Sequence, residues 1–212
     1  MGNYRNRVAD GILKDNLEAA GLVLIEGTKW CGKTTTAEQQ AGSIVYMNDP
    51  SNSGTYLALA QNSPSLLLKG DTPRLIDEWQ DAPELWDAAR FEVDHRDTKT
   101  GQFIFTDSTV IPKEKLERIK HSGTGRAAWI KMRPMSLWES GESNGQLSFN
   151  DLFLNRTDTA YQSNELGIEQ LAWLICRGLE SESPLKDSHK DIRHPIFCRS
   201  FDSDRRYGNR TG

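Results

Sequence analysis

Cysteine is scarce in this sequence of 212 residues, which contains only Cys31, Cys176 and Cys198. Their wide spacing provides neither a disulfide framework nor a cysteine-based metal site, so we expect a reducing compartment and predict a cytoplasmic protein. Long apolar runs are also missing. None approaches the roughly 20 residues that cross a bilayer, and the N-terminal residues lack the apolar core of a signal peptide, so we expect no membrane contact.

An excess of positive charge is absent as well, because 26 Lys and Arg face 30 Asp and Glu, for a net charge of −4. This balance argues against a protein whose whole surface binds nucleic acid. Residues 113–133 nevertheless form a basic stretch, which is either a solvated face or a surface for a protein or DNA partner. Residues 71–97 are acidic, and the two stretches together would steer copies of the chain into a homo-oligomer.

Short apolar runs alternate with amphipathic helical patterns along the first two thirds of the chain. This alternation predicts an α/β fold in which helices cover both faces of a mainly parallel, five-stranded sheet, that is, three layers. The expected strands are residues 22–27, 43–49, 73–79, 101–108 and 127–134. The expected helices are residues 4–20, 34–42, 82–94 and a weaker pattern over 56–68 that Pro64 interrupts.

A glycine-rich loop joins the first expected strand to the helix after it. From Gly27 to Thr34 it has the spacing G-x-x-x-x-G-K-T, which is the Walker A pattern of P-loop proteins. In such loops backbone N–H groups and the helix N-terminus surround phosphates, the lysine reaches the β- and γ-phosphates, and the Thr hydroxyl binds Mg²⁺. We therefore predict that ATP and Mg²⁺ bind at Gly27, Thr28, Lys29, Trp30, Cys31, Gly32, Lys33, Thr34 and Thr35.

Two acids follow the third apolar run, Leu75–Ile76, in the arrangement called Walker B. We predict that Asp77 joins Thr34 in holding Mg²⁺ and that Glu78 orients and polarises the attacking water. Adjacent acids of this kind are typical of ATPases that have an extra strand between the P-loop strand and the Walker B strand. Residues 101–108 would supply that strand, and Thr106 or Ser108 would then sense the γ-phosphate.

Arg126 ends the Gly-rich segment 121–126, which suits an arginine finger that stabilises the charge of the transferred phosphate. The predicted catalytic residues are therefore Glu78, Lys33 and Arg126, and the predicted reaction is ATP hydrolysis. The main alternative is a nucleotide-dependent binding or oligomerisation switch with little or no turnover. A small-molecule kinase is less favoured, because the sequence has no Arg-rich lid.

Four segments resemble a large family of bacterial and archaeal AAA-type ATPases that carry a C-terminal domain of unknown function. They are residues 26–41, 73–94, 121–126 and 132–145, and the resemblance extends over about residues 4–178. It implies an ATPase domain over residues 1–150. Within it Lys33, Thr34, Asp77 and Glu78 match the family's ATPase positions, and Arg126 matches an arginine after the sensor strand.

The sequence departs from that family at two places. Asp107 replaces a glycine of the sensor strand, where a carboxylate would either repel the γ-phosphate or point away from it. After Gly178 the chain no longer follows the family, so we expect residues 151–178 to be a helical extension toward a missing second domain. The polar residues 179–212 are expected to be a disordered or aberrant tail.

Overall fold

The computed structural model describes residues 4–107, 125–146, 148–154 and 167–177. It divides into two compact units, residues 1–143 and 144–212. The second unit contributes α8 (Phe149–Phe153) and α9 (Ile168–Arg177). The predicted tail, and the segment between the fourth and fifth strands, lie outside the described residues. Among the helices that are described, none combines the length and apolarity that a membrane crossing requires.

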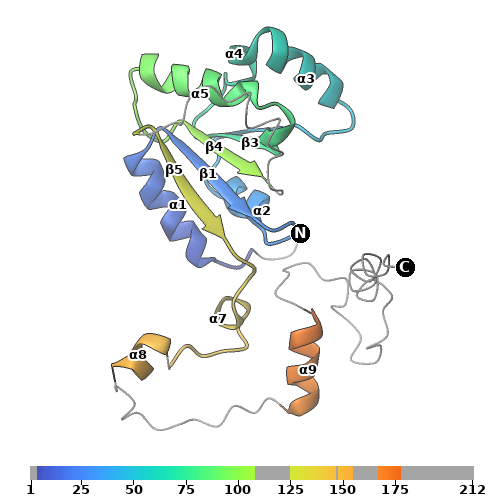
Figure 1. The fold of residues 1–212 in the computed structure, drawn as a ribbon, viewed down its shortest axis with the longest axis vertical. Helices are drawn as coiled ribbons and strands as arrows, with labels where there is room; N and C mark the ends of the chain where they lie inside the picture. Colours follow the sequence, from blue (N-terminus) through green and yellow to red (C-terminus); the bar gives the residue numbers. More distant parts are fainter. Residues whose placement is uncertain (1–3, 108–124, 147, 155–166, 178–212) are drawn as a thin grey trace, which may run out of the picture. The chain divides into compact units, whose positions relative to one another are not determined.

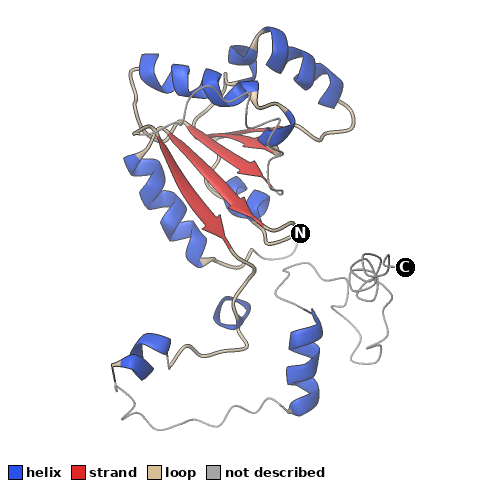
Figure 2. Cartoon of the chain, viewed as in Figure 1, coloured by secondary structure: helices blue, strands red, loops and turns tan. Residues whose placement is uncertain are grey.

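The first unit is built on a five-stranded sheet in the order β2-β3-β4-β1-β5, and all of its strand pairs are parallel (Figures 1 and 2). The strands are β1 (Leu22–Gly27), β2 (Ser43–Tyr46), β3 (Arg74–Asp77), β4 (Phe103–Asp107) and β5 (Ala127–Met132). The predicted parallel sheet is confirmed. The extra strand is also where it was expected, because β4 lies between β1 and β3.

Helices cover both faces of this sheet. Successive side chains of β1 point to opposite faces, and the first four are apolar and buried, so both faces need a covering layer. Leu22 and Leu24 belong to one core, whereas Val23 and Ile25 belong to a second. The first core includes α3 (Ser53–Asn62), α4 (Pro64–Leu67) and α5 (Glu84–His95), and the second includes α1 (Val8–Ala19) and α2 (Lys33–Glu38). The three-layer α/β class is therefore confirmed (Figure 1).

Several elements are shorter than expected: β2 ends at Tyr46 instead of residue 49, α2 ends at Glu38 instead of residue 42, and α1 begins at Val8 instead of residue 4. Two further differences have a local cause. The third strand ends at Asp77 instead of residue 79, because Glu78 has left-handed backbone angles (φ 58°, ψ 44°) and a 3₁₀ turn follows at Trp79–Asp81. The weak pattern over residues 56–68 forms two helices. Pro64 begins the second, and the residue before a proline is disfavoured in helical geometry, so the first helix ends at Asn62.

A buried ion pair joins the start of α1 to α7 (Leu137–Ser140), far along the chain. Arg7 Nε lies 3.1 Å from Glu139 Oε1, and the two side chains are 4% and 7% exposed. Burial alone would raise the pKa of Glu139. Hydrogen bonds from the Ser136 and Val8 backbones, the Ser136 hydroxyl and Arg7 outweigh it and lower that pKa to about 2.

The lowered pKa of Glu139 makes the free energy of unfolding depend on pH in the acidic range. Because its folded-state pKa lies below its usual value of 4.5, the contribution is complete above about pH 5 and is lost toward pH 2. At neutral pH it amounts to about 3 kcal/mol of unfolding free energy. We therefore expect Glu139→Gln to lower the urea midpoint at pH 7 and to have a steadily smaller effect as the pH falls from 5 to 2.

The control for this prediction is Glu18→Gln, which removes an exposed carboxylate of α1 and should change stability little at any pH. A loss of stability in Glu139→Gln that is equal at pH 7 and pH 3 would contradict the assigned pKa.

Candidate active site

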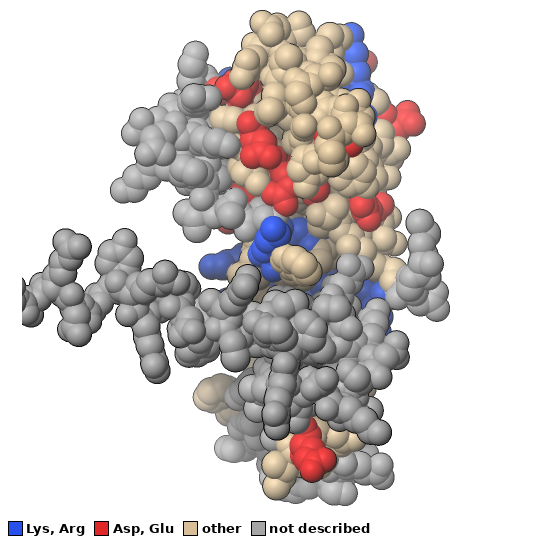
Figure 3. Space-filling view, turned by 90° about the vertical axis from the view of Figure 1, so that its right-hand side faces the viewer, with Lys and Arg blue, Asp and Glu red and all other residues tan. Residues whose placement is uncertain are grey.

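The predicted nucleotide site lies where the carboxyl ends of β1, β3 and β4 meet. Strand register places Asp77 beside Thr106 and Glu26 beside Asp107. The arrowheads of these strands point to the right-hand side of Figure 1, which faces the viewer in Figure 3. There a compact group of Lys and Arg side chains lies directly below a group of acidic ones. Both signs of charge are therefore available to a ligand at this edge.

The predicted phosphate loop, residues 27–34, has a strained backbone. Gly32 has φ 93°, and Trp30, which is not glycine, has φ 73°. Left-handed residues turn backbone N–H groups toward a common point, which is how such loops surround an anion. Gly27 is needed for a different reason, since a Cβ there would lie 2.5 Å from the Met132 carbonyl of β5. The loop is thus packed closely on the sheet, while the Trp30 side chain remains 57% exposed.

Lys33 is buried beneath this loop, with only 4% of its surface exposed. Its Nζ donates to the carbonyl oxygens of Gly27, at 3.0 Å, and Thr28, at 2.8 Å. These two hydrogen bonds to the loop therefore fix the position of the ammonium group. A phosphate there would meet a charge that has already lost most of its water, and this makes a charge-assisted hydrogen bond strong.

Three oxygen-bearing side chains form a network beside Lys33. Asp77 Oδ1 accepts from the Thr34 hydroxyl at 2.7 Å and from the Thr106 hydroxyl at 2.6 Å. Burial raises the pKa of Asp77, Glu78 and Glu38 add to this rise, and the two hydroxyls oppose it. Asp77 is 4% exposed, so a cation would favour its ionised form. The predicted metal residues Thr34 and Asp77 are therefore in contact.

The donor set fits Mg²⁺, which prefers oxygen ligands and usually keeps several waters when it is bound beside substrate phosphates. In the described part of the chain no three His, Cys, Asp or Glu side chains cluster closely enough to hold a metal by themselves. A site made of one hydroxyl, one carboxylate and ligand phosphates is consistent with both observations.

Glu78 lies at the mouth of the site. Its backbone N–H donates to Thr106 Oγ1 at 3.3 Å, and its carboxylate accepts a hydrogen bond from the Gln80 amide. The left-handed conformation is uncommon for a residue other than Gly, Asn or Asp, and such residues concentrate at functional sites. The contact of Gln80 could not be predicted from the sequence, because no local pattern marks an amide that holds the Glu78 carboxylate.

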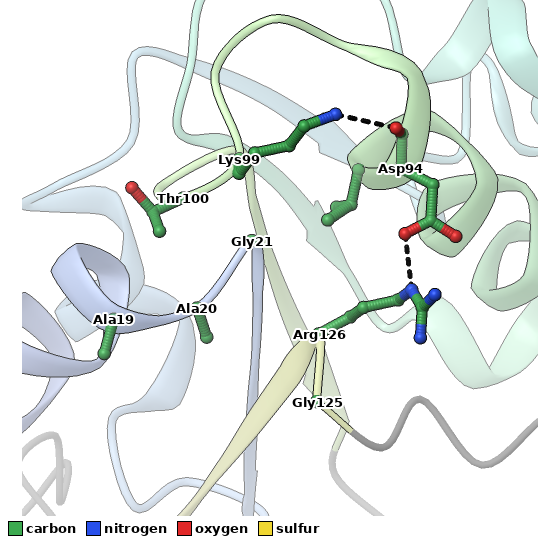
Figure 4. Close-up of a pocket in the computed structure, with 9 residues that line it drawn as sticks. Ala19, Ala20, Gly21, Asp94, Lys99, Thr100, Gly125 and Arg126 are labelled. Atoms are coloured by element: carbon green, nitrogen blue, oxygen red, sulfur yellow. Dashed lines mark hydrogen bonds and ion pairs between the residues drawn. The ribbon is translucent and has the colours of Figure 1, made fainter.

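Arg126 is not brought together with these residues. Its carbonyl oxygen accepts hydrogen bonds from Gly21 N and Leu22 N, each at 3.1 Å. Arg126 therefore lies at the amino ends of β1 and β5, whereas the predicted nucleotide site lies at the carboxyl ends of the strands. Its guanidinium pairs with Asp94 of α5, and this hydrogen bond lowers the pKa of Asp94. Figure 4 shows the two side chains, with Lys99, at a cavity of about 400 Å³.

The other residues predicted from the sequence are only partly among the described residues. Thr106 is buried in the network with Asp77, whereas Ser108 and residues 113–124 of the basic stretch lie outside the described residues. Asp107, the departure from the family pattern, is 4% exposed at the end of β4, beside Glu26 in register. Its effect on a γ-phosphate stays a prediction.

In solved structures, the chain is similar to the Walker-type ATPase PABY2304 of Pyrococcus abyssi, with 12% identity and a TM-score of 0.47 over 84% of this chain and 64% of that one. It is also similar to C. elegans PCH-2, with 14% identity and a TM-score of 0.33 over 68% of this chain and 48% of that one.

The chain therefore spans less than two thirds of the length of either structure. No curated protein matches it. The model of one family, described as the AAA domain, matches residues 19–140, more than half of the chain and all five strands. The chain belongs to the AAA domain family.

Proposed function

We propose that this protein binds ATP with Mg²⁺ at the carboxyl end of its sheet and hydrolyses the bond between the β- and γ-phosphates, which releases inorganic phosphate. The observation that supports this most directly is the contact of Thr34, Asp77 and Thr106 beside a buried Lys33. Loop N–H groups and Lys33 would hold the phosphates, and Thr34 and Asp77 would hold the metal. When bound, Mg²⁺ supplies positive charge to the phosphate oxygens.

Glu78 is the residue best placed to orient water, because it follows Asp77 directly and lies at the edge of the site. Its carboxylate would take up a proton as the water attacks. Gln80 would keep this side chain in position through its amide.

A second function is favoured by the position of Arg126. Its guanidinium pairs with Asp94 at the amino ends of the strands, so in this conformation Arg126 would not act as a finger on the phosphates of its own chain. A single chain would then bind nucleotide and turn it over slowly, as a switch. Assembly into a homo-oligomer would bring Arg126 of one copy to the nucleotide of the next.

Titration of the purified chain with ATP and Mg²⁺ tests the proposal. We expect saturable binding by calorimetry, release of inorganic phosphate, and a change in tryptophan emission, because Trp30 is exposed within the loop. The chain has six tryptophans, so Trp30→Phe is the matched control: it should bind ATP but lose most of the emission change. Absence of binding would refute the proposal, whereas binding without phosphate release would favour the switch.

A further inference from the structure

A single guanidinium connects three separate parts of the first unit. Arg7 Nη1 donates to the Cys31 carbonyl in the phosphate loop at 2.9 Å, and Nη2 donates to the Arg133 carbonyl just after β5 at 3.0 Å. Nε donates to Glu139 of α7 at 3.1 Å. The side chain is 4% exposed, so these protein groups replace water around its charge. Only arginine offers a planar fork with donors in several fixed directions.

We propose that Arg7 is the positioning residue of the phosphate loop, and that it couples the shape of this loop to the segment leaving β5 and to α7. This inference rests on the proposed function, because a loop shape matters here only for the nucleotide that it binds. Arg7 would not touch the nucleotide. It would act through the carbonyl of Cys31.

The position of Cys31 explains why the loop needs such support. Its neighbours on both sides, Trp30 and Gly32, have left-handed backbone angles, and for Trp30 this conformation is unfavourable unless surrounding contacts maintain it. Cys31 is fixed twice. The residue is 1% exposed, and its thiol lies 3.9 Å from the Met132 carbonyl oxygen of β5. Its carbonyl accepts the hydrogen bond from Arg7. Removing the second contact would free the peptide that joins Cys31 to Gly32.

The other end of the connection is also held by several hydrogen bonds. Glu139 accepts hydrogen bonds from Arg7, from the backbone of Val8 and from Ser136 at the start of α7, so its carboxylate is held by both segments. It in turn holds the guanidinium in the orientation that reaches Cys31. By thermodynamic linkage, a ligand that stabilises the loop conformation should then also slow amide exchange in α7.

Calorimetry with ATP and Mg²⁺ on the full chain provides the test. Arg7→Gln and Arg7→Lys should both bind about tenfold more weakly, since lysine keeps the charge but cannot reach three acceptors at once. Arg5→Gln is the matched control. Arg5 is exposed and donates to the Ser140 carbonyl of α7, so its loss tests the attachment of α7 without the loop contact; binding should stay within about twofold of the parent.

A double-mutant cycle separates positioning from simple stabilisation. Glu139→Gln should weaken ATP binding by about threefold in the parent, but not further in the Arg7→Gln background, because Glu139 acts on the loop only through Arg7. In hydrogen exchange, ATP should slow the amides of Glu139 and Ser140 in the parent and not in either Arg7 variant.

The outcomes distinguish this inference from the proposed function. A parent that does not bind ATP refutes both. A parent that binds ATP while the Arg7 variants bind it equally well, even with lowered melting temperatures, overturns the positioning role alone. If Arg7→Gln does not fold, Arg7→Lys and Glu139→Gln decide the matter, and unchanged affinity in both overturns the inference.

Discussion

Replacement of Lys33 by alanine is expected to weaken ATP binding by about 100-fold or more. The ammonium is already buried and held by the Gly27 and Thr28 carbonyls, so a phosphate gains a charge-assisted hydrogen bond without first ordering the side chain. Such a bond contributes about 3 kcal/mol, which corresponds to about 100-fold in affinity. Calorimetry with ATP and Mg²⁺ measures the loss directly.

Lys14→Ala is the control, because it removes the same charge from an exposed position on α1. Its affinity should equal that of the parent within about twofold, since an exposed charge in salt solution acts weakly over a distance. Thermal melting of both variants shows whether the fold is kept. A folded Lys33→Ala protein with the parent's affinity would remove Lys33 from the site and, with it, the interpretation of the loop.

The local motifs were predictable because their physical requirements are local. A Walker A loop needs glycines and a lysine within a few residues, and Gly27 to Thr34 supply them in order. The sequence also predicted the extra strand that carries Thr106. Because parallel strands bring their carboxyl ends to the same end of the sheet, this strand places Thr106 where it contacts Asp77. Arg126 directly precedes β5, so it lies at the amino ends of the parallel strands, opposite to residues that follow their strands.

Other features had no signal in the sequence. In a sequence, glycine and asparagine are the residues that indicate left-handed backbone angles. Trp30 and Glu78 do not indicate them, and at these two positions tertiary contacts impose the conformation. Arg7 and Glu139 are separated by 132 positions, so no periodicity connects them. In the sequence, an arginine just before a helix and a glutamate in the short helix α7 look like ordinary surface charges, and only the fold shows that they form a pair.

The positions of Glu78 and Arg126, at opposite edges of the sheet, lead to the last prediction. Glu78→Gln should keep ATP affinity and slow phosphate release by at least about 100-fold, because an amide accepts no proton. Arg126→Ala should also leave affinity unchanged, and it should slow phosphate release by about 10³-fold if the finger operates fully. Arg90→Ala is the matched control: Arg90 pairs with the same Asp94, from α5, and its loss should not affect turnover.

Mixing the two inactive variants then decides whether Arg126 acts within a chain or between chains. In an assembly, a chain with intact Glu78 beside a neighbour with intact Arg126 forms a complete site, and random mixing at equal amounts makes about a quarter of the sites complete. Phosphate release should therefore recover to about a quarter of the parent rate. Recovery is what the structure leads us to expect, because Arg126 cannot serve the phosphates of its own chain from the start of β5. If the mixture stays inactive while both single variants remain slow, the finger acts in cis and Arg126 must leave its position beside Asp94. If both single variants match the parent, neither residue is catalytic and the nucleotide switch becomes the better description.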